Sequence, residues 1–318
     1  MTSHNLRIYS KQACAGLVLV TAGANLWTTT RPIGRGPVAF LGMTYPTPGV
    51  RPATRLQQPR LLSGLLTAWL GAWLSGRAAA DDLLAAAGGS DEPHTVRGLA
   101  DEAGSAPFAR VLPLLRRCAP AEVTLRFPVP GDPDGLSGPA LAAALRAGQA
   151  VAIQPHAVEL PGWLLIPEVD VRGTSLEPLI TVEWAVVALR DRLPTSPMAA
   201  TRLREAELAL SESVGAAAAV IAEIGQVGQL SPEILTAIKE LRKRNGLRLP
   251  LPPGSPVDAI RVLTTAQRLE AVVELAAGEQ PLSAAADARR TSALREVDRA
   301  VRDAFRLAFA ACASGEAR

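Results

Sequence analysis

The first segment of the chain with a clear hydrophobic pattern is residues 61–76, where apolar residues recur at helical spacing. Over residues 61–76, Leu62, Leu65, Trp69 and their neighbours stand three and four positions apart, which places them on one face of a helix. The opposite face carries no basic residue in this stretch, so the pattern favours a buried helix over one that lies on a membrane. Shorter helices are expected over residues 78–87, before the Gly-Gly pair, and over 107–118.

The pattern then shortens and becomes richer in β-branched residues between 121 and 190. We expect four strands, over residues 123–129, 150–154, 162–171 and 179–187, and the last of these stretches also fits a helix. A helix over residues 138–147 separates the first two strands. Strands this close in sequence pair most simply as a small antiparallel meander.

The remainder of the chain returns to helical spacing with clear start and stop signals. An apolar seam runs over 203–224, and Ser231-Pro232 and Ser255-Pro256 each open a further helix. A last helix is expected from Ser283. Short connections between these elements predict an antiparallel bundle of about four helices. The predicted fold class is therefore α+β, mainly α, with amino-terminal helices, a small antiparallel β-meander and a carboxy-terminal antiparallel helix bundle.

Residues 1–60 differ from the rest in composition and charge. They hold seven of the 33 basic residues, and no acidic residue precedes Asp81. They are rich in Pro, Gly and Thr without a hydrophobic period, which predicts a disordered basic extension. Residues 1–24 also have the outline of a signal peptide, and an overlong translation start is a further explanation. We divide the chain into this extension, a helical and β-meander region over 61–190, and a helical bundle over 191–318.

The charge and the cysteines set bounds on location and partners. Beyond residue 60 the chain has 26 basic and 30 acidic residues, so its predicted body is mildly acidic. Cys14, Cys118 and Cys312 are scattered, with no CxxC spacing for a metal or a redox pair. We expect a cytoplasmic protein, with secretion through residues 1–24 as the alternative. No cofactor is predicted, because no P-loop or nucleophile motif is present.

One group of polar residues has the composition of a metal site. Asp132 and Asp134 fall in a Pro- and Gly-rich turn, Glu168 and Asp170 come near a strand end, and His156 lies between them. Carboxylates and an imidazole could hold a divalent cation if they converged. The competing interpretation is that Asp-Pro-Asp-Gly forms a tight turn and that the other residues face solvent.

Several separate stretches resemble a known family. They are PVPGDPDGLSGPALAAALRAGQAV, GWLLIPEV, LPPGSPVDAIRVLTTAQRLEAVVELA and the ending ALREVDRAVRDAFRLAFAA. Together they resemble a family of uncharacterised proteins from GC-rich bacteria over about residues 61–312, and residues 1–60 lie outside the resemblance. The resemblance implies no activity and assigns no residue a role.

The sequence alone leaves the function unknown and supports three hypotheses. The first is a non-enzymatic interaction or regulatory protein whose partner is a protein, either a second copy or another chain. The second is a metal-assisted enzyme or small-ligand binder that uses the acidic turn and His156. The third and weakest is binding of nucleic acid or membrane by the basic extension. The other basic cluster, over residues 241–248, fits a helix carboxyl end, where basic side chains complement the helix dipole.

Overall fold

The computed structural model describes residues 59–88, 94–99, 104–173, 178–189, 191–194, 199–225, 249–277 and 283–315. All of them belong to one compact unit, Val50–Arg318. Its elements, in chain order, are α1 (Pro59–Leu74), α2 (Ala80–Gly88), β1 (His94–Arg97), β2 (Ala106–Pro107), the 3-10 helix η2 (Phe108–Val111), α3 (Leu112–Arg116), β3 (Ala121–Arg126), α4 (Gly138–Ala147), β4 (Ala150–Pro155), β5 (Gly162–Gly173), β6 (Pro178–Leu189), α5 (Ala199–Gly225), α7 (Val257–Ala277) and α8 (Ala284–Ser314).

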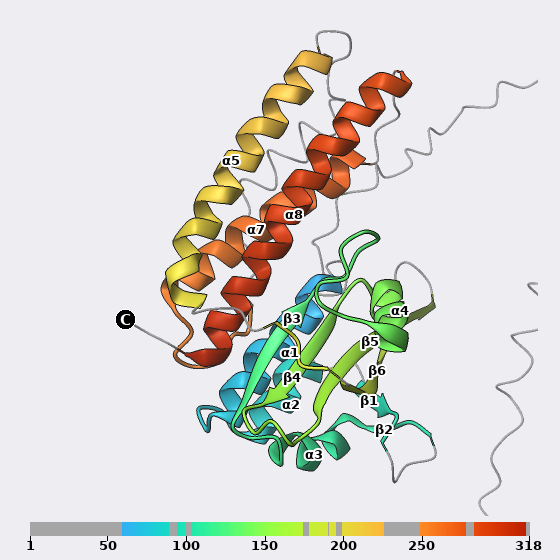
Figure 1. The fold of residues 1–318 in the computed structure, drawn as a ribbon, viewed down its shortest axis with the longest axis vertical. Coiled ribbons are helices and arrows are strands. Elements are labelled where there is room, and N and C mark those ends of the chain that lie inside the picture. The colour runs from blue at the N-terminus through green and yellow to red at the C-terminus, as the bar shows by residue number, and fades with distance from the viewer. Residues whose placement is uncertain are drawn as a thin grey trace, which may run out of the picture. The chain divides into compact units, whose positions relative to one another are not determined.

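The strands form one six-stranded sheet in the order β2-β1-β6-β5-β4-β3 (Figure 1). Strands β3 to β6 pair antiparallel with their sequence neighbours, which confirms the predicted meander. Strand β1 pairs parallel with β6 and antiparallel with β2, so the complete sheet is mixed. The stretch that also fitted a helix, residues 179–187, lies within strand β6.

The two faces of the sheet are covered differently. One face contributes Val151, Leu165 and Trp184 to a core that also contains side chains of α1, α2 and α3. The other face contributes Ala152, Leu164 and Ile166, among others, to a core with α4. Alternation along each strand explains this, because successive side chains point to opposite faces of a sheet.

Helix α4 has the bounds that its sequence predicts. Ser137 is extended at the N-cap, Pro139 lies in the first turn, and Gly148 ends the helix in the left-handed conformation with φ 68°. Proline fits the first turn because the amide it lacks has no helical acceptor there, and glycine adopts positive φ without a Cβ penalty. The chain therefore turns directly from α4 into β4.

Helix α1 lies between the sheet and the carboxy-terminal helices. Its residues Leu62, Leu66 and Trp69 face the sheet core, whereas Leu61 and Leu65 pack with α5, α7 and α8 in a separate core. A Cβ built on Gly64 would lie 2.1 Å from the Phe309 ring, so this glycine lets α1 and α8 approach closely. The amino-terminal helix is thus shared by both cores.

The carboxy-terminal helices pack around α8. Helices α5 and α8 lie side by side over much of their length, and α7 packs on α8 as well (Figure 1). Leu203, Leu210 and Leu263 are buried between them, with Phe305 and Phe309 at the end of α8 nearest to α1. The helix predicted after Ser231-Pro232 lies outside the described residues, as do residues 1–58, which include nearly all of the predicted extension.

Candidate functional site

The acidic turn that the sequence singled out connects β3 to α4. Val129 and Asp132 exchange backbone hydrogen bonds of 2.9 Å each, which closes a tight loop. Asp134 has φ 49°, the left-handed region that Asp tolerates better than most residues, and Gly131 and Gly135 also have positive φ. The Asp134 amide donates to Asp132 Oδ1 at 3.3 Å. This turn chemistry holds the Asp134 side chain in one direction, toward the protein interior.

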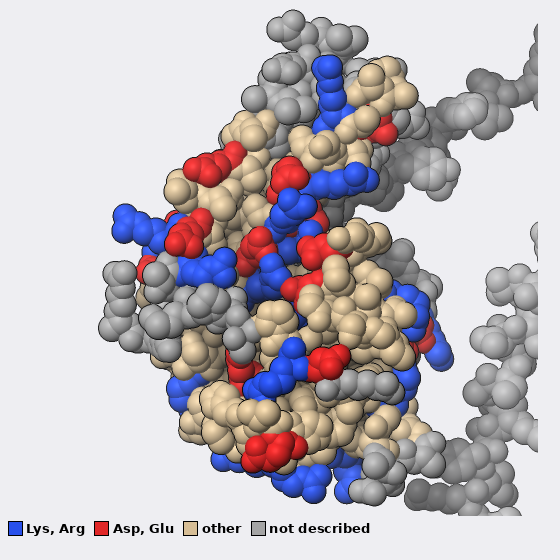
Figure 2. Space-filling view, in the orientation of Figure 1, with Lys and Arg blue, Asp and Glu red and all other residues tan. Residues whose placement is uncertain are grey.

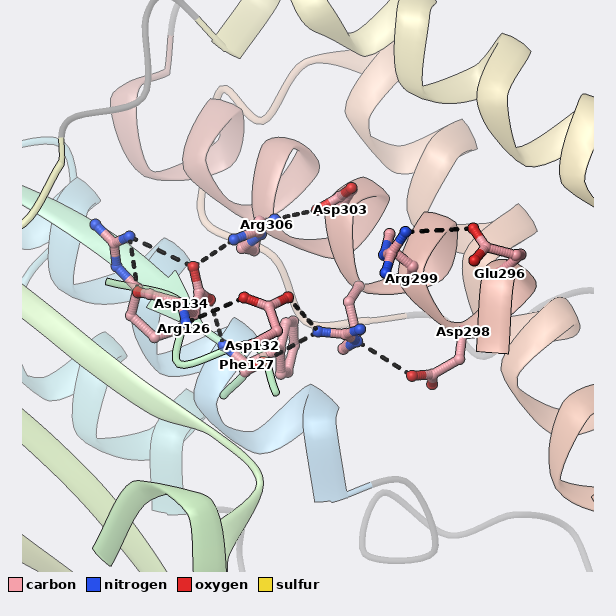
Figure 3. Close-up of polar contacts among 10 residues, drawn as sticks. Arg126, Phe127, Asp132, Asp134, Glu296, Asp298, Arg299, Asp303 and Arg306 are labelled. Carbon is pink, nitrogen blue, oxygen red and sulfur yellow. Dashed lines mark hydrogen bonds and ion pairs between the residues drawn. The ribbon is translucent and has the colours of Figure 1, made fainter. Parts of the chain in front are cut away.

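Asp134 is the centre of a buried ion-pair network (Figure 3). Its side chain is 5% exposed; Oδ2 accepts the Phe127 amide at 2.7 Å, and Oδ1 pairs with Arg306 of α8 and with Arg126 of β3, the latter at 3.6 Å. Arg306 also binds Asp303 one helical turn away. A carboxylate that is buried this deeply requires such partners, because an unpaired charge in the interior is strongly destabilised.

A second arginine of α8 reaches the same turn. Arg302, whose side chain is 8% exposed, donates from Nη1 to the Phe127 carbonyl at 3.2 Å and pairs with Asp132 Oδ2 at 3.4 Å. Its Nε pairs with Asp298 at 3.1 Å within the helix. Asp132 is 49% exposed, so its ion pair is more accessible to water than that of Asp134. The two aspartates therefore have unequal roles.

Burial and charge act on these arginines in opposite directions. Burial lowers the pKa of Arg126 despite the attraction of Asp134. Burial likewise opposes the charge of Arg306, but the carboxylates of Asp134 and Asp303 more than offset it and raise the pKa of Arg306. The acidic turn thus stabilises two charged guanidinium groups at the junction of the sheet and α8.

The segment that leads from β6 to α5 is fixed at the same junction. Gln154 of β4 accepts from the Leu193 amide at 2.7 Å and donates to the Leu193 carbonyl at 3.3 Å. Arg126 donates to the Pro194 carbonyl at 2.9 Å. We call Arg126, Asp132, Asp134, Arg302 and Arg306 the arginine–aspartate junction. Its geometry supports a structural role: it fastens the sheet to α8.

The structure does not bring the other predicted ligands to this turn. His156 is exposed after β4, at the opposite end of the β3–β4 pair from the turn, a separation of about 17 Å at about 3.3 Å per strand residue. Glu168 pairs with Arg97, and Asp170 pairs with Arg172 at 2.7 Å. Within the described ranges, no group of three or more His, Cys, Asp or Glu residues is arranged to hold a metal ion.

A shallow surface pocket of about 270 Å³ opens near His156. Its lining includes Gln154, Val158, Glu159, Asp191 and Arg192. The buried Gln154 amide is already bonded to Leu193 at both ends, and Arg192 donates to the Pro155 carbonyl at 2.8 Å. These polar groups hold the chain together at the β4–β5 connection rather than converge on a ligand.

The arginines of the junction were not predicted from the sequence. Arg302 and Arg306 stand four residues apart and alternate with Asp298 and Asp303, a pattern that alone indicates exposed pairs within a helix. Arg126 is the last residue of β3, which also contains the charged Glu122, so nothing in the strand singles it out. The signal that distinguishes Arg302 and Arg306 is the helix face they share with the buried Phe305 and Phe309, which turns them toward the protein rather than toward solvent.

On the face drawn in Figure 2, basic and acidic side chains are interspersed over the described residues rather than gathered by sign. A surface that binds nucleic acid through phosphates gathers Lys and Arg on one face. The basic cluster over residues 241–248 lies outside the described residues. No described helix combines the length and the hydropathy needed to cross a bilayer.

Comparison with known proteins places the chain. Residues 63–200 match the N-terminal domain of the Rv1486c-like protein, and residues 204–306 match its C-terminal domain. The chain belongs to the Rv1486c-like protein family. Over 270 residues it is 31% identical to "Uncharacterized protein Rv1486c" of Mycobacterium tuberculosis strain H37Rv and to "Uncharacterized protein MT1533" of strain CDC 1551; the match covers 75% of this chain and 92% of each relative. No solved structure matches it.

The resemblance expected from the sequence, to an uncharacterised family from GC-rich bacteria, is confirmed. The match to the N-terminal domain of the family ends at residue 200, and the match to the C-terminal domain begins at residue 204, near the start of α5. The boundary that we predict from the sequence lies between residues 190 and 191. Asp132 and Asp134 fall in the N-terminal match, and Arg302 and Arg306 fall in the C-terminal match. The arginine–aspartate junction therefore joins the two domains of the family.

Proposed function

We propose that this Rv1486c-like protein is a non-catalytic interaction or regulatory protein and that it binds its protein partner through the end of the β5–β6 hairpin. The observation that carries the proposal is a pair of exposed apolar side chains on one face of the hairpin: Val169 and Val171 are 40% and 62% exposed. Leu179, which is 56% exposed, lies opposite Arg172 on the other face. Large apolar side chains that gather on a surface mark interaction sites more often than isolated ones do.

The length of the hairpin supports this proposal. Strands β5 and β6 have 12 residues each and pair along their whole length, whereas the six-residue strand β4 pairs only with Trp163, Leu164 and Leu165 of β5. The distal part of β5 therefore extends past its neighbour. Backbone groups at such an edge are a known docking point for another chain.

The state of the carboxylates supports the non-catalytic part of the proposal. Asp134 is bonded to Phe127 and two arginines, and Asp132 pairs with Arg302. A catalytic acid or base needs to reach a substrate proton, and a carboxylate held in a buried ion pair is not placed to do so. The carboxylates that looked most site-like in the sequence thus hold the fold together.

A cytoplasmic location completes the proposal. Cys118 and Cys312 are both buried free thiols. Burial raises the pKa of the Cys118 thiol, which is the state of an inert structural cysteine. Two unpaired cysteines fit a reducing compartment better than an oxidising one.

A site-specific crosslinking experiment tests the function. A photo-crosslinking amino acid is placed at position 171 of the full chain in its own host, and a matched control carries it at position 208, where Leu208 is 59% exposed on α5. We expect discrete protein adducts from position 171 that are absent at position 208 and that disappear when Val169→Asp is added. Equal labelling from both positions, or adducts that survive Val169→Asp, would contradict the proposal.

A further inference from the structure

The distal part of β5 has a strand neighbour on one side only. Residues 167–173 pair with β6, but the pairing with β4 stops at Leu165. Among the described residues, no other strand pairs with this edge. The side chains on it are accessible: Glu168, Asp170 and Arg172 are 49%, 52% and 76% exposed. Helix α4 packs on the proximal part of the strand, over Leu164 and Ile166.

We propose that this edge pairs with the same edge of a second copy, so that two β5 strands lie antiparallel across a two-fold axis at Asp170. The proposal rests on the proposed function and names the partner. A symmetric antiparallel pair requires that residue i faces residue j and that j faces i. With Asp170 on the axis, Val169 faces Val171 of the second copy, and Glu168 faces Arg172 of the second copy.

Opposite charges face each other in this register. Residues directly opposite each other in an antiparallel pair interact, and opposite charges there are favourable. The Asp170-centred register forms two Glu168–Arg172 pairs between copies. Asp170 meets its own counterpart, but each Asp170 already pairs with Arg172 of its own chain at 2.7 Å. Within each chain Arg97 pairs with Glu168 and also with Glu183, so Arg172 of the second copy supplies a further positive charge beside Glu168.

The apolar face of the pairing is also consistent. Val169 lies opposite the fully buried Val182 within the hairpin, and Val171 lies opposite Ile180. Both valines thus extend the face that forms the sheet core, and pairing would cover them with the same residues of the second copy. Seven strand residues make a contact smaller than the roughly 800 Å² per partner of a stable interface, so we expect a dissociation constant in the roughly micromolar range.

Disulfide trapping tests the register. In a Cys14→Ser background, Asp170→Cys places two thiols across the axis on Cα atoms about 4.5 to 5.5 Å apart, within the range of a disulfide. The matched control is Leu179→Cys on β6, where the original side chain is 56% exposed. In the proposed dimer, position 179 of one copy would lie three strand spacings of about 4.8 Å each from position 179 of the other copy. Cys118 and Cys312 are buried in both variants, so neither should form a disulfide between copies.

We expect Asp170→Cys to form a covalent dimer in more than about half of the chains under mild oxidation, and Leu179→Cys in less than about a tenth. In sedimentation experiments, Arg172→Glu should raise the dimer dissociation constant about tenfold, because it faces Glu168 with a like charge twice. Arg299→Glu is the matched control, since Arg299 is 61% exposed on α8, and it should leave the constant unchanged.

A chain that remains monomeric up to about 100 times the expected constant would overturn the self-pairing, and so would equal trapping of both cysteine variants. The two failures remain distinguishable. Adducts from position 171 with a different protein would leave the proposed function standing and remove only the second copy. Absence of any site-dependent adduct would remove both.

Discussion

Cys312 illustrates how the surroundings of one residue fix its chemistry. The thiol is fully buried near the end of α8, and burial raises its pKa to about 11 although Ser255 and Arg77 act in the opposite direction. The thiolate is the reactive form of cysteine, so this residue is inert near neutral pH. Its role is to fill space in the core that α1 and α8 share.

The raised pKa of Cys312 predicts a loss of stability in alkali. In the unfolded chain the thiol ionises near its ordinary pKa of 9.0, whereas the folded protein retains the proton up to about pH 11. Stability from this group is therefore complete below pH 9 and is lost as the pH rises toward 11, by about 2 kcal/mol. Urea unfolding of the wild type and of Cys312→Ala at pH 8.5 and 10.5 measures this. The alanine variant should lose less stability between the two pH values; equal losses would contradict the prediction.

At the scale of elements, the contact of α1 with α8 depends on small residues. Gly64 lies against the Phe309 ring, and a Cβ at Gly71 would lie 2.8 Å from the Ala313 carbonyl oxygen. Arg77, just after α1, donates to the carbonyls of Cys312 at 3.2 Å and of Ala313, the unpaired groups at the end of α8. The first and last described helices are thereby fixed to each other.

A pair of glycine substitutions separates packing from helix propensity. Gly64→Ala should destabilise the protein by about 2 kcal/mol, because the new methyl group overlaps the Phe309 ring. Gly215→Ala in α5 should stabilise it by about 0.5 to 1 kcal/mol, since a Cβ there meets nothing within 4 Å. Thermal unfolding followed by circular dichroism measures both. Similar effects of the two changes would show that close helix contact is not what Gly64 provides.

Most elements could be predicted because their signals are local. Ser137, Pro139 and Gly148 mark α4 without reference to the rest of the chain, and β-branched alternation marks β3 to β6. Strands β1 and β2 were missed because they have only four and two residues. The parallel pairing of β1 with β6 joins His94 to Val182, and such a distant pairing leaves no local pattern.

The candidate site was predicted only in part, for the same reason. The sequence correctly indicates that Asp132 to Gly135 form a tight turn, since Asp, Pro and Gly are turn residues. It does not reveal that Arg302 and Arg306 lie against that turn, about 170 residues later. Without those partners a buried carboxylate and a metal ligand look alike in the sequence. The metal site itself stays a prediction that the observed ion pairs do not favour.

At the scale of the whole molecule, the two domains of the family are joined by buried charge and by packing together. Asp134 of the N-terminal domain and Arg302 of the C-terminal domain have side chains that are 5% and 8% exposed, and each pairs with a residue of the other domain. A buried pair contributes little net stability compared with apolar residues, but removal of one partner leaves the other charge uncompensated. The arginine–aspartate junction therefore determines how the sheet and α8 fit together more than how strongly they adhere.

The most direct test of this account compares Asp134→Asn with Asp132→Asn by chemical unfolding. Asparagine retains the positive φ of position 134 and removes only the charge. We predict that Asp134→Asn lowers the free energy of unfolding by about 3 kcal/mol, because it leaves Arg126 and Arg306 without their shared carboxylate. Asp132→Asn should cost less than about 1 kcal/mol, since its carboxylate is half exposed.

Addition of Arg306→Gln completes a double-mutant cycle, which should give a coupling energy above about 1 kcal/mol with Asp134 and a smaller one with Asp132. Equal, small effects of the two asparagine variants would contradict the account. They would mean that the acidic turn does not fasten the two domains of this Rv1486c-like protein to each other.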